Sequence, residues 1–223
     1  MTENDEIYYK HGAKFSLSQS VVKYARKKMY AHFMKTVQPT KGTKILDFGV
    51  SEFITDESNF LEKNYPHHED LTCVGIGDGK QVKQHFPNVN YFSLIPNEKL
   101  PFDDNSFDVS YSNAVFEHLD TDALRVFFFN ELARVSKRVY ITIPNRWFPV
   151  EHHTAVPLLH YIPSLFRKFL SGGEKDFWAQ QENLAFLGKK ELAEVAKSHP
   201  VKIAYSGIFL GPMSSNISIW TDK

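Results

Sequence analysis

Two short runs of acids and histidines are the residues of this sequence best suited to do chemistry. One is Glu117-His118, and the other is Glu151-His152-His153 further along the chain. A carboxylate beside an imidazole can act as a general base, which contributes roughly 10²–10⁴-fold to a rate. Two acids with their histidines could instead hold a divalent cation. We take Glu117, His118 and His153 as candidate catalytic residues; for the first two, bracing of a loop is a third possible role.

Two predicted strands must bring these runs together. Residues 106–112 and 138–144 read as strands, and one acid–histidine run follows each of them. In open α/β sheets, ligands bind beyond the carboxyl ends of parallel strands. The two loops should therefore open on the same edge of the sheet. The other expected elements are helices over 18–37 (capped by Ser18 or Ser20), 121–136 and 189–197, strands over 44–48, 71–76 and 89–93, and a terminal antiparallel pair over 201–206 and 215–220.

The stretch 44–49 reads as a buried parallel strand that delivers its end to a ligand. It is a short apolar run that closes on Asp47 and Gly49. A glycine at that point lets the backbone approach a ligand closely. Asp47 and Gly49 are therefore candidate ligand-binding residues.

Three segments in order carry a resemblance to a known family. They are the strand run KILDFG (44–49), the run LPFDDNSFD (100–108) and the run AVFEHL (114–119), and ELARV (131–135) and ITIPNRW (141–147) follow. The set resembles the class I S-adenosylmethionine (SAM) dependent methyltransferases. It is closest to a type 11-like subgroup with LPF-x-D-x-SFD, EHL and TIPNRWFP-x-E-x-H motifs. The resemblance covers roughly residues 40–220.

The resemblance implies a fold and a domain plan. The expected fold is α/β and Rossmann-like: a doubly wound, mostly parallel sheet of about seven strands. A terminal antiparallel hairpin and a helical cap insertion should complete it. The whole chain, 1–223, should be a single SAM-dependent methyltransferase domain, with an N-terminal arm and helix in 1–40 and the cap insertion in 145–187.

The resemblance also implies SAM as cofactor and a set of residues to bind it. Ser51 and Phe53 stand where the family has its second and third loop glycines, so hydroxyls and amides of the loop are expected to bind instead. Gly77 stands where the family has an acid for the ribose, and Asp78 follows it directly. Asp78 therefore either holds the ribose hydroxyls or is a turn residue. The expected cofactor-binding residues are Asp47, Gly49, Ser51, Asp78, Leu100 and Asn113.

Related methyltransferases that act on ubiquinone precursors, or on the terminal ribose of small RNAs, also resemble this chain around Glu117-His118. They use a further acid three residues earlier, where this chain has Ala114. Because that ligand is missing, we assign no metal site from the sequence. The expected role of the group is to act on an acceptor hydroxyl or to brace the cofactor loop.

Composition limits the partners and the compartment. Lys plus Arg equals Asp plus Glu, at 26 each, so the formal net charge is zero and no global basic field favours nucleic acid. The one cysteine, Cys73, excludes an intramolecular disulfide. The polar N-terminus is no signal peptide, and no apolar run has membrane-spanning length. We expect a soluble, cytoplasmic protein, and the sequence predicts no oligomeric state.

The segment 145–187 is longer than an ordinary connection, which indicates a functional cap. Its apolar and aromatic residues could line an acceptor pocket, touch a lipid-linked substrate at a membrane surface, or only pack on the domain. We expect O-methylation of a small-molecule or glycan-type acceptor. The similar bacterial subgroup suggests surface-polysaccharide synthesis. Two alternatives are a non-catalytic partner subunit with this fold and an NAD-binding oxidoreductase, whose turn the run 75–79 superficially resembles.

Overall fold

The computed structural model describes residues 16–55 and 58–222, and its centre is one sheet of seven strands in the order β3-β2-β1-β4-β5-β7-β6. The first five strands are parallel, β7 pairs antiparallel with β5, and β6 pairs antiparallel with β7. This confirms the expected fold. The strands are β1 (Ile45–Phe48), β2 (Leu71–Gly75), β3 (Asn90–Ser93), β4 (Val109–Asn113), β5 (Val139–Pro144), β6 (Val201–Leu210) and β7 (Met213–Thr221).

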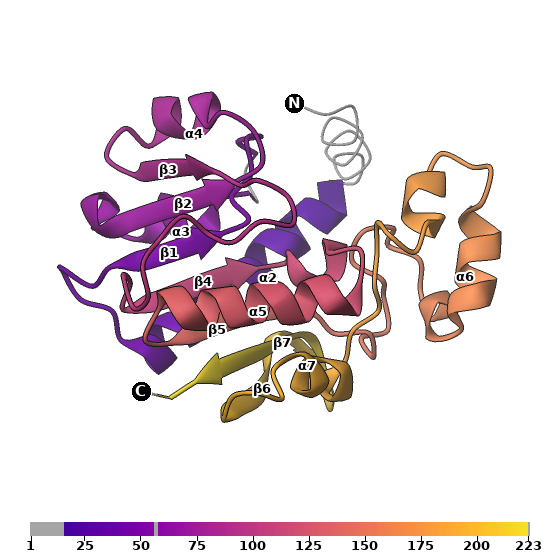
Figure 1. Cartoon of the computed structure of the whole chain (residues 1–223). Helices are drawn as coiled ribbons and strands as arrows, with labels where there is room; N and C mark the ends of the chain where they lie inside the picture. The colour runs from indigo at the N-terminus through magenta and orange to yellow at the C-terminus, as the bar shows by residue number, and fades with distance from the viewer. Residues whose placement is uncertain (1–15, 56–57, 223) are drawn as a thin grey trace.

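Helices cover both faces of the sheet; α5 lies in front of it and α2 behind it in Figure 1. The α-helices are α2 (Ser16–Val37), α3 (Phe60–Asn64), α4 (Lys80–His85), α5 (Asp122–Val135), α6 (Pro163–Leu170) and α7 (Lys189–Val195). Because α2 begins at Ser16, the expected cap at Ser18 or Ser20 is wrong. Thr121 caps α5, and its hydroxyl accepts a hydrogen bond from the Leu124 backbone.

The alternation of side chains along β1 shows how the two faces are filled. Leu46 and Phe48 point into a core shared with α5 and α7, whereas Ile45 points into a core shared with α2, α3 and α4. Successive strand residues face opposite sides, so Asp47 shares the face of Ile45. The result places a buried acid among apolar side chains at the end of the central strand.

Residues 145–187, which we call the cap segment, run from the end of β5 to the start of α7 and project to the right of the sheet in Figure 1. The cap segment contains α6 and two 3₁₀ turns, Leu159–Tyr161 and Asp176–Ala179. It has a small core of its own around Phe166 and Trp178. The cap segment therefore folds into a packed unit beside the carboxyl ends of the strands.

None of the helices formed by the described residues combines the length and apolar character needed to cross a membrane.

Candidate active site

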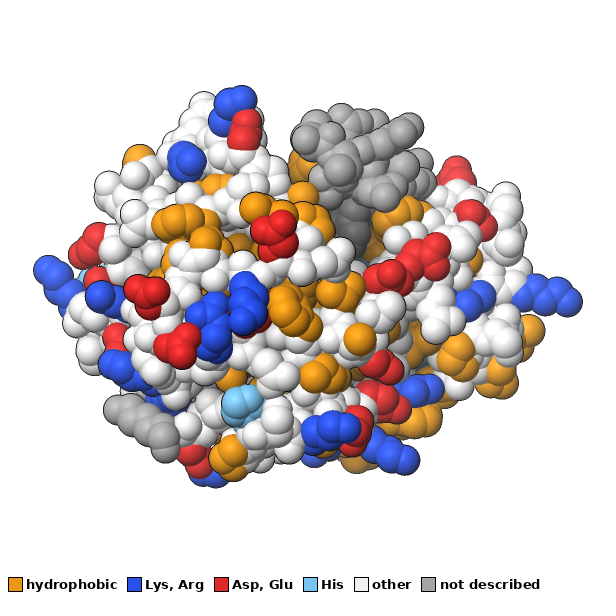
Figure 2. Space-filling model, in the orientation of Figure 1, with side chains coloured by type: hydrophobic (Ala, Val, Ile, Leu, Met, Phe, Trp, Pro, Cys, Tyr) orange, Lys and Arg blue, Asp and Glu red, His pale blue; other side chains and the backbone are white. Residues whose placement is uncertain are grey.

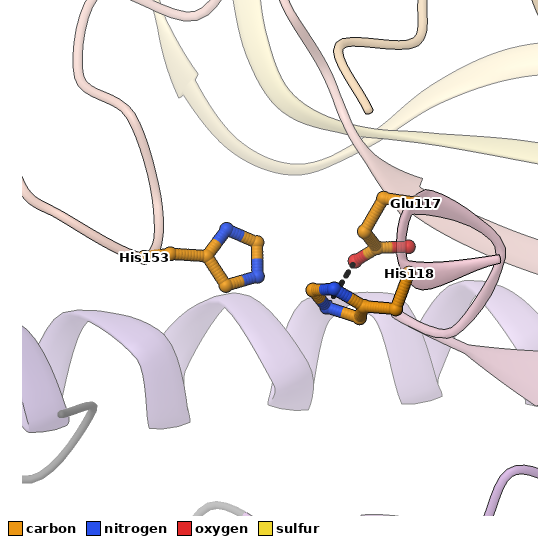
Figure 3. A group of neighbouring side chains, drawn as sticks. All are labelled: Glu117, His118 and His153. Atoms are coloured by element: carbon orange, nitrogen blue, oxygen red, sulfur yellow. Dashed lines mark ion pairs between the residues drawn. The ribbon is translucent and has the colours of Figure 1, made fainter. Parts of the chain in front are cut away.

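The loops after β4 and β5 meet at one place. Glu117 and His118 come from a 3₁₀ turn, Phe116–His118, that follows β4, and His153 comes from the cap segment after β5. One ligand atom from each of these three side chains lies within 4.8 Å of the others (Figure 3). The structure thus brings together the three residues that the sequence singled out.

A buried arginine fixes the turn that carries Glu117. Arg125 of α5 donates from Nε to the carbonyl of Phe116 at 2.9 Å and from Nη2 to the carbonyl of Leu119. Asp122 accepts from the same guanidinium at 2.5 Å. On the other side, the backbone N–H of Ala185 donates to the Glu117 carbonyl at 2.8 Å. These contacts tie the turn to both α5 and the cap segment.

Glu151 orients His153. Its carboxylate accepts from the backbone N–H groups of His153 at 3.0 Å and Thr154 at 2.7 Å, and from the Thr154 hydroxyl at 2.6 Å. It also lies 2.9 Å from His153 Nδ1. With Nδ1 held in this way, the other ring nitrogen, Nε2, points toward Glu117 and His118 (Figure 3).

A backbone carbonyl orients His118 in the same manner. His118 Nδ1 lies 2.9 Å from the carbonyl oxygen of Asn183. A carbonyl only accepts, so Nδ1 carries the proton and Nε2 presents its lone pair. That Nε2 lies 3.8 Å from Glu117 Oε1. Both histidines therefore turn Nε2 toward the Glu117 carboxylate, which is the arrangement of metal-binding histidines with oriented rings.

Burial controls the ionisation of the group. Burial raises the pKa of Glu117 to about 7, although the nearby His153 partly opposes this. Burial lowers the pKa of His118 to about 3 and that of His152 to about 4. For His153, burial acts to lower the pKa, but the Glu151 carboxylate and then Glu117 outweigh it, and the pKa is raised. Glu151 has a lowered pKa, because His153 and the hydrogen bonds outweigh its burial.

Glu117 is a buried acid whose charge is not balanced by hydrogen bonds within the described part of the chain. Its side chain is 2% exposed, and neither carboxylate oxygen makes a hydrogen bond to a described residue. Burying a carboxylate without hydrogen bonds is costly, and such groups in native proteins call for an explanation. An oxygen or a cation that arrives from outside would supply the missing partner.

A cavity of about 20 Å³ lies beside Glu117, between the cap segment and the end of β5. A space of roughly 10–15 Å³ holds one water molecule, so this cavity admits a single water or hydroxyl group. His152 Nε2 and His160 Nδ1 line it and, like Glu117, make no hydrogen bond to a described residue. Three polar groups with free capacity thus converge on one small space.

The expected cofactor-binding residues are only partly gathered at the ends of β1 and β4. Gly49 and Asn113 end these neighbouring strands, and Leu100 is buried nearby in the core shared with Phe48. The Asn113 amide oxygen accepts from the Thr142 hydroxyl at 2.7 Å.

Two others lie differently. Ser51 closes a turn on its own loop, because its Oγ accepts from the Phe53 N–H at 2.9 Å. Asp78 is 58% exposed on its side chain and pairs with Lys80 at 2.6 Å.

Comparisons with known proteins identify the fold. Residues 67–139 match a family model described as a methyltransferase domain. A SAM-dependent methyltransferase of Aquifex aeolicus superposes with a TM-score of 0.57 at 13% identity, over 98% of each chain. The chain has the fold of the SAM-dependent methyltransferases. A possible histamine N-methyltransferase of Thermotoga maritima gives 0.60 at 14% identity over 96% of this chain and 97% of its own. A protein of Pyrococcus horikoshii OT3 gives 0.63 at 15% identity over all of both chains.

None of the curated proteins compared with the chain matches it. The match to a methyltransferase domain supports a methyltransferase, and the fold is one shared with enzymes whose cofactor is SAM. At these sequence identities the solved structures show the fold alone.

The residues at the end of β1 fit a SAM-dependent methyltransferase. Gly49 has φ +95°, and a Cβ there would lie 2.2 Å from a methyl carbon of Val115. The position therefore excludes a side chain, because Val115 of the loop after β4 packs directly against it. The buried Glu117 stands on the next loop, with free acceptor capacity. The adenosyl side differs from the pattern that the resemblance predicts, because Gly77 replaces the acid at the end of β2.

Asp47 does not face the group around Glu117 but forms a buried acid pair with Glu62 of α3. Both side chains are buried. Burial first, then the charge of Glu62 and a hydrogen bond to it, raises the pKa of Asp47 well above its usual range. Cys73 Sγ lies 3.2 Å from Glu62 Oε1, and its pKa is also raised by burial and by these acids. The Asp47 carboxyl therefore keeps its proton to a higher pH than an ordinary acid.

Glu62→Gln is expected to make the protein more stable at pH 8, by about 1–2 kcal/mol, and to stabilise it less at pH 5. The pKa of Asp47 is raised in the folded state, so its stabilising proton is fully present below the unfolded pKa. That contribution is lost as the pH rises through the folded pKa. Glutamine removes the like charge and still accepts from Cys73. Urea unfolding at the two pH values measures the difference, and equal effects at both would contradict it.

The anchors of the histidines were not predicted from the sequence. The carbonyl of Asn183 and the guanidinium of Arg125 both act on the turn at Glu117, yet neither belongs to a motif. A carbonyl is present in every residue, and so its use carries no sequence signal. The Arg125 position, four residues into α5, could have been recognised only by knowing how α5 packs.

Proposed function

We propose that this protein transfers a methyl group from SAM to an oxygen atom of a small-molecule or glycan-type acceptor. The observation that carries the proposal is the buried group of Glu117, His118 and His153 at the carboxyl edge of the sheet. A SAM-dependent enzyme places its methyl donor along this edge, by the general rule for open α/β sheets. A group able to engage a hydroxyl there suits an oxygen acceptor, because oxygen needs help to lose its proton.

When bound, SAM supplies a methyl group already activated on a sulfonium. The chain's own task is then alignment and proton handling. Gly49 and Asn113 form the strand ends against which the donor is held. The cavity beside Glu117 accepts the acceptor's hydroxyl group, and the cap segment covers it from the far side and excludes water.

As a base, the group would use Glu117 to take the hydroxyl proton. The carboxylate has free acceptor capacity, since no described residue donates to it. His153 lies close enough to stabilise the charge, and Glu151 keeps its ring in place. Removal of the proton as the methyl group arrives makes the oxygen a better nucleophile.

A divalent cation at the same place is the second candidate, and the orientation of the two histidines favours it. Glu117, His118 and His153 would hold the ion, His153 with Glu151 and His118 with the Asn183 carbonyl as its supporting partner. The ion would acidify the acceptor hydroxyl. Ala114 offers no fourth ligand where related enzymes have an acid, so the remaining positions would be filled by water or substrate.

The outer face of the cap segment supports a lipid-linked acceptor, as in polysaccharide synthesis. Leu165 and Phe169 lie one turn apart on α6 and are 47% and 65% exposed, and Ile162, which directly precedes α6, is 57% exposed. Figure 2 shows hydrophobic side chains on this side of the molecule. Lys168 is exposed on the same helix. An apolar row with a neighbouring cation suits the surface of an anionic membrane.

Replacing both Leu165 and Phe169 by serine is expected to lower binding to phosphatidylglycerol vesicles several-fold, because each change removes exposed apolar area from the contact. Co-sedimentation of the full chain with vesicles measures it. The matched control is Phe209→Ser on β6, an aromatic residue of comparable exposure, 57%, outside the cap segment. Equal loss with the control, or no binding by the wild type, would refute the membrane contact.

Calorimetric titration tests the function itself. Purified protein is titrated with SAM, S-adenosylhomocysteine and NAD. Binding of the first two, and release of S-adenosylhomocysteine in the presence of a panel of sugars and phenols, supports the proposal. Binding of NAD alone would indicate an oxidoreductase. No binding of any of the three compounds would indicate a non-catalytic partner subunit. Turnover with and without EDTA, followed by addition of Mg²⁺, Mn²⁺ or Zn²⁺, separates base from cation.

A further inference from the structure

Glu52, in the loop after β1, places its carboxylate over the end of β2. The backbone N–H of Gly79 donates to Oε1, and that of Gln81 donates to Oε2 at 3.3 Å. A Cβ at Gly77 would lie 3.1 Å from Glu52 Cγ and 3.4 Å from Oε1. The carboxylate of Glu52 therefore lies where a side chain at position 77 would begin.

The loop around Glu52 is held in a fixed shape. Ser51 Oγ accepts from the Phe53 N–H at 2.9 Å and lies 3.1 Å from the Phe53 carbonyl, to which it donates. The Ser51 N–H donates to Asn59 Oδ1 at 3.0 Å, and Asn59 Nδ2 donates back to the Ser51 carbonyl at 2.8 Å. Ser51 and Phe53 thus stand in place of flexible glycines and close a turn that directs Glu52 across to β2.

The two acids near this strand end differ in what they can still accept. Asp78 is exposed and pairs with Lys80 at 2.6 Å. Glu52 is half-buried, and a carboxylate has about four acceptor positions, of which two backbone donors take two. The Tyr91 phenol also hydrogen-bonds this carboxylate, and burial and then Glu52 raise the pKa of Tyr91. Glu52 is the more shielded acid and retains acceptor capacity.

We propose that Glu52, and not Asp78, accepts the ribose hydroxyls of SAM. This inference rests on the proposed function. Rossmann-type sites use an acid at the end of the second strand to hold the ribose, and a carboxylate binds two neighbouring hydroxyls with charge-assisted hydrogen bonds. In this chain the acid reaches the same point from the preceding loop. One rearrangement then explains three departures from the family pattern, which are the lack of a glycine at 51, of a glycine at 53 and of an acid at 77.

The test compares two probes by calorimetry, S-adenosylhomocysteine and its 2′-deoxy analogue. Wild type should prefer the natural ribose by roughly tenfold or more, as expected for a charged hydrogen bond. Glu52→Gln should weaken S-adenosylhomocysteine binding by roughly 10- to 100-fold and reduce the preference to within about twofold. Asp78→Asn, the matched control, should change neither value. Thermal melting of both variants checks that the fold is kept.

The sugar preference separates a binding role from a structural one. A Glu52 that only caps α4 would affect melting and total affinity, and would leave the preference for the 2′-hydroxyl unchanged. An unchanged preference in Glu52→Gln, or its loss in Asp78→Asn, would overturn the inference while the proposed function stands. Failure of the wild type to bind S-adenosylhomocysteine would overturn the proposed function, and this inference with it.

Discussion

Replacing Glu117 by glutamine is expected to lower methyl transfer by roughly 10²–10⁴-fold and to leave the melting temperature unchanged or higher. The side chain is 2% exposed, and its carboxylate makes no hydrogen bond to a described residue. Glutamine has the same size but cannot take a proton or bind a cation well. Because it also carries no charge to bury, the fold loses little. Turnover with a working acceptor and thermal melting measure the two effects.

Asp120→Asn is the matched control for Glu117→Gln. Asp120 is an exposed acid in the same loop, so its loss should change neither quantity. His118→Ala and His153→Ala should reduce turnover as Glu117→Gln does, since the three side chains lie together and the proposed function uses them as one group. If Glu117 only braces the cofactor loop, the result reverses: the glutamine variant melts earlier and keeps most of its activity.

The topology could be predicted because it depends on patterns that the sequence displays. Short apolar runs separated by helical stretches are typical of parallel strands buried on both faces. The order of the motifs then assigns each apolar run to a strand of the sheet. The first and last residues of the strands could be predicted less well. The strand expected over 106–112 begins at Val109, because Phe107 forms only an isolated bridge to Ser136 and Asp108 pairs with Lys137 at 2.7 Å. These contacts come from elements distant in sequence.

The convergence of Glu117, His118 and His153 could also be predicted. Both acid–histidine runs follow parallel strands, β4 and β5, which pair directly. Parallel neighbours deliver their following loops to the same edge, so spacing within each loop mattered little. The sequence could not reveal which ring nitrogen faces inward. That is set by Glu151 and by the carbonyl of Asn183, whose position depends on how the cap segment folds back.

The two acids near the end of β2 show what strand order alone cannot predict. A motif assigns roles by position along a strand, and by that rule Asp78 was the nearest acid to the end of β2. The structure turns Asp78 outward to Lys80 and brings Glu52 from another loop. The turn that does so depends on hydrogen bonds between Ser51 and both Phe53 and Asn59. Sequence spacing contains no direct signal for such a bond.

Gly49→Ala is expected to destabilise the protein by about 3 kcal/mol or more and to abolish binding of S-adenosylhomocysteine. Two costs add at this residue. Its φ of +95° disfavours any side chain, and an added Cβ would lie 2.2 and 2.9 Å from the two methyl carbons of Val115. Val115 packs on the main core and its two methyl groups both face the glycine, so rotation about χ1 does not relieve the clash. Urea unfolding and calorimetry measure the two losses.

Two further variants divide that loss into its parts. Gly42→Ala has a similar φ, +86°, with nothing within 4 Å of an added Cβ, so it reports the backbone strain alone, about 1–3 kcal/mol. Val115→Ala in the Gly49→Ala background removes the two clashing methyl groups, and we expect it to recover the packing part of the loss but not the strain. If the double variant is no more stable than Gly49→Ala, the end of β1 does not depend on packing against the loop after β4. The loop that carries Glu117 would then be positioned by α5 and the cap segment instead.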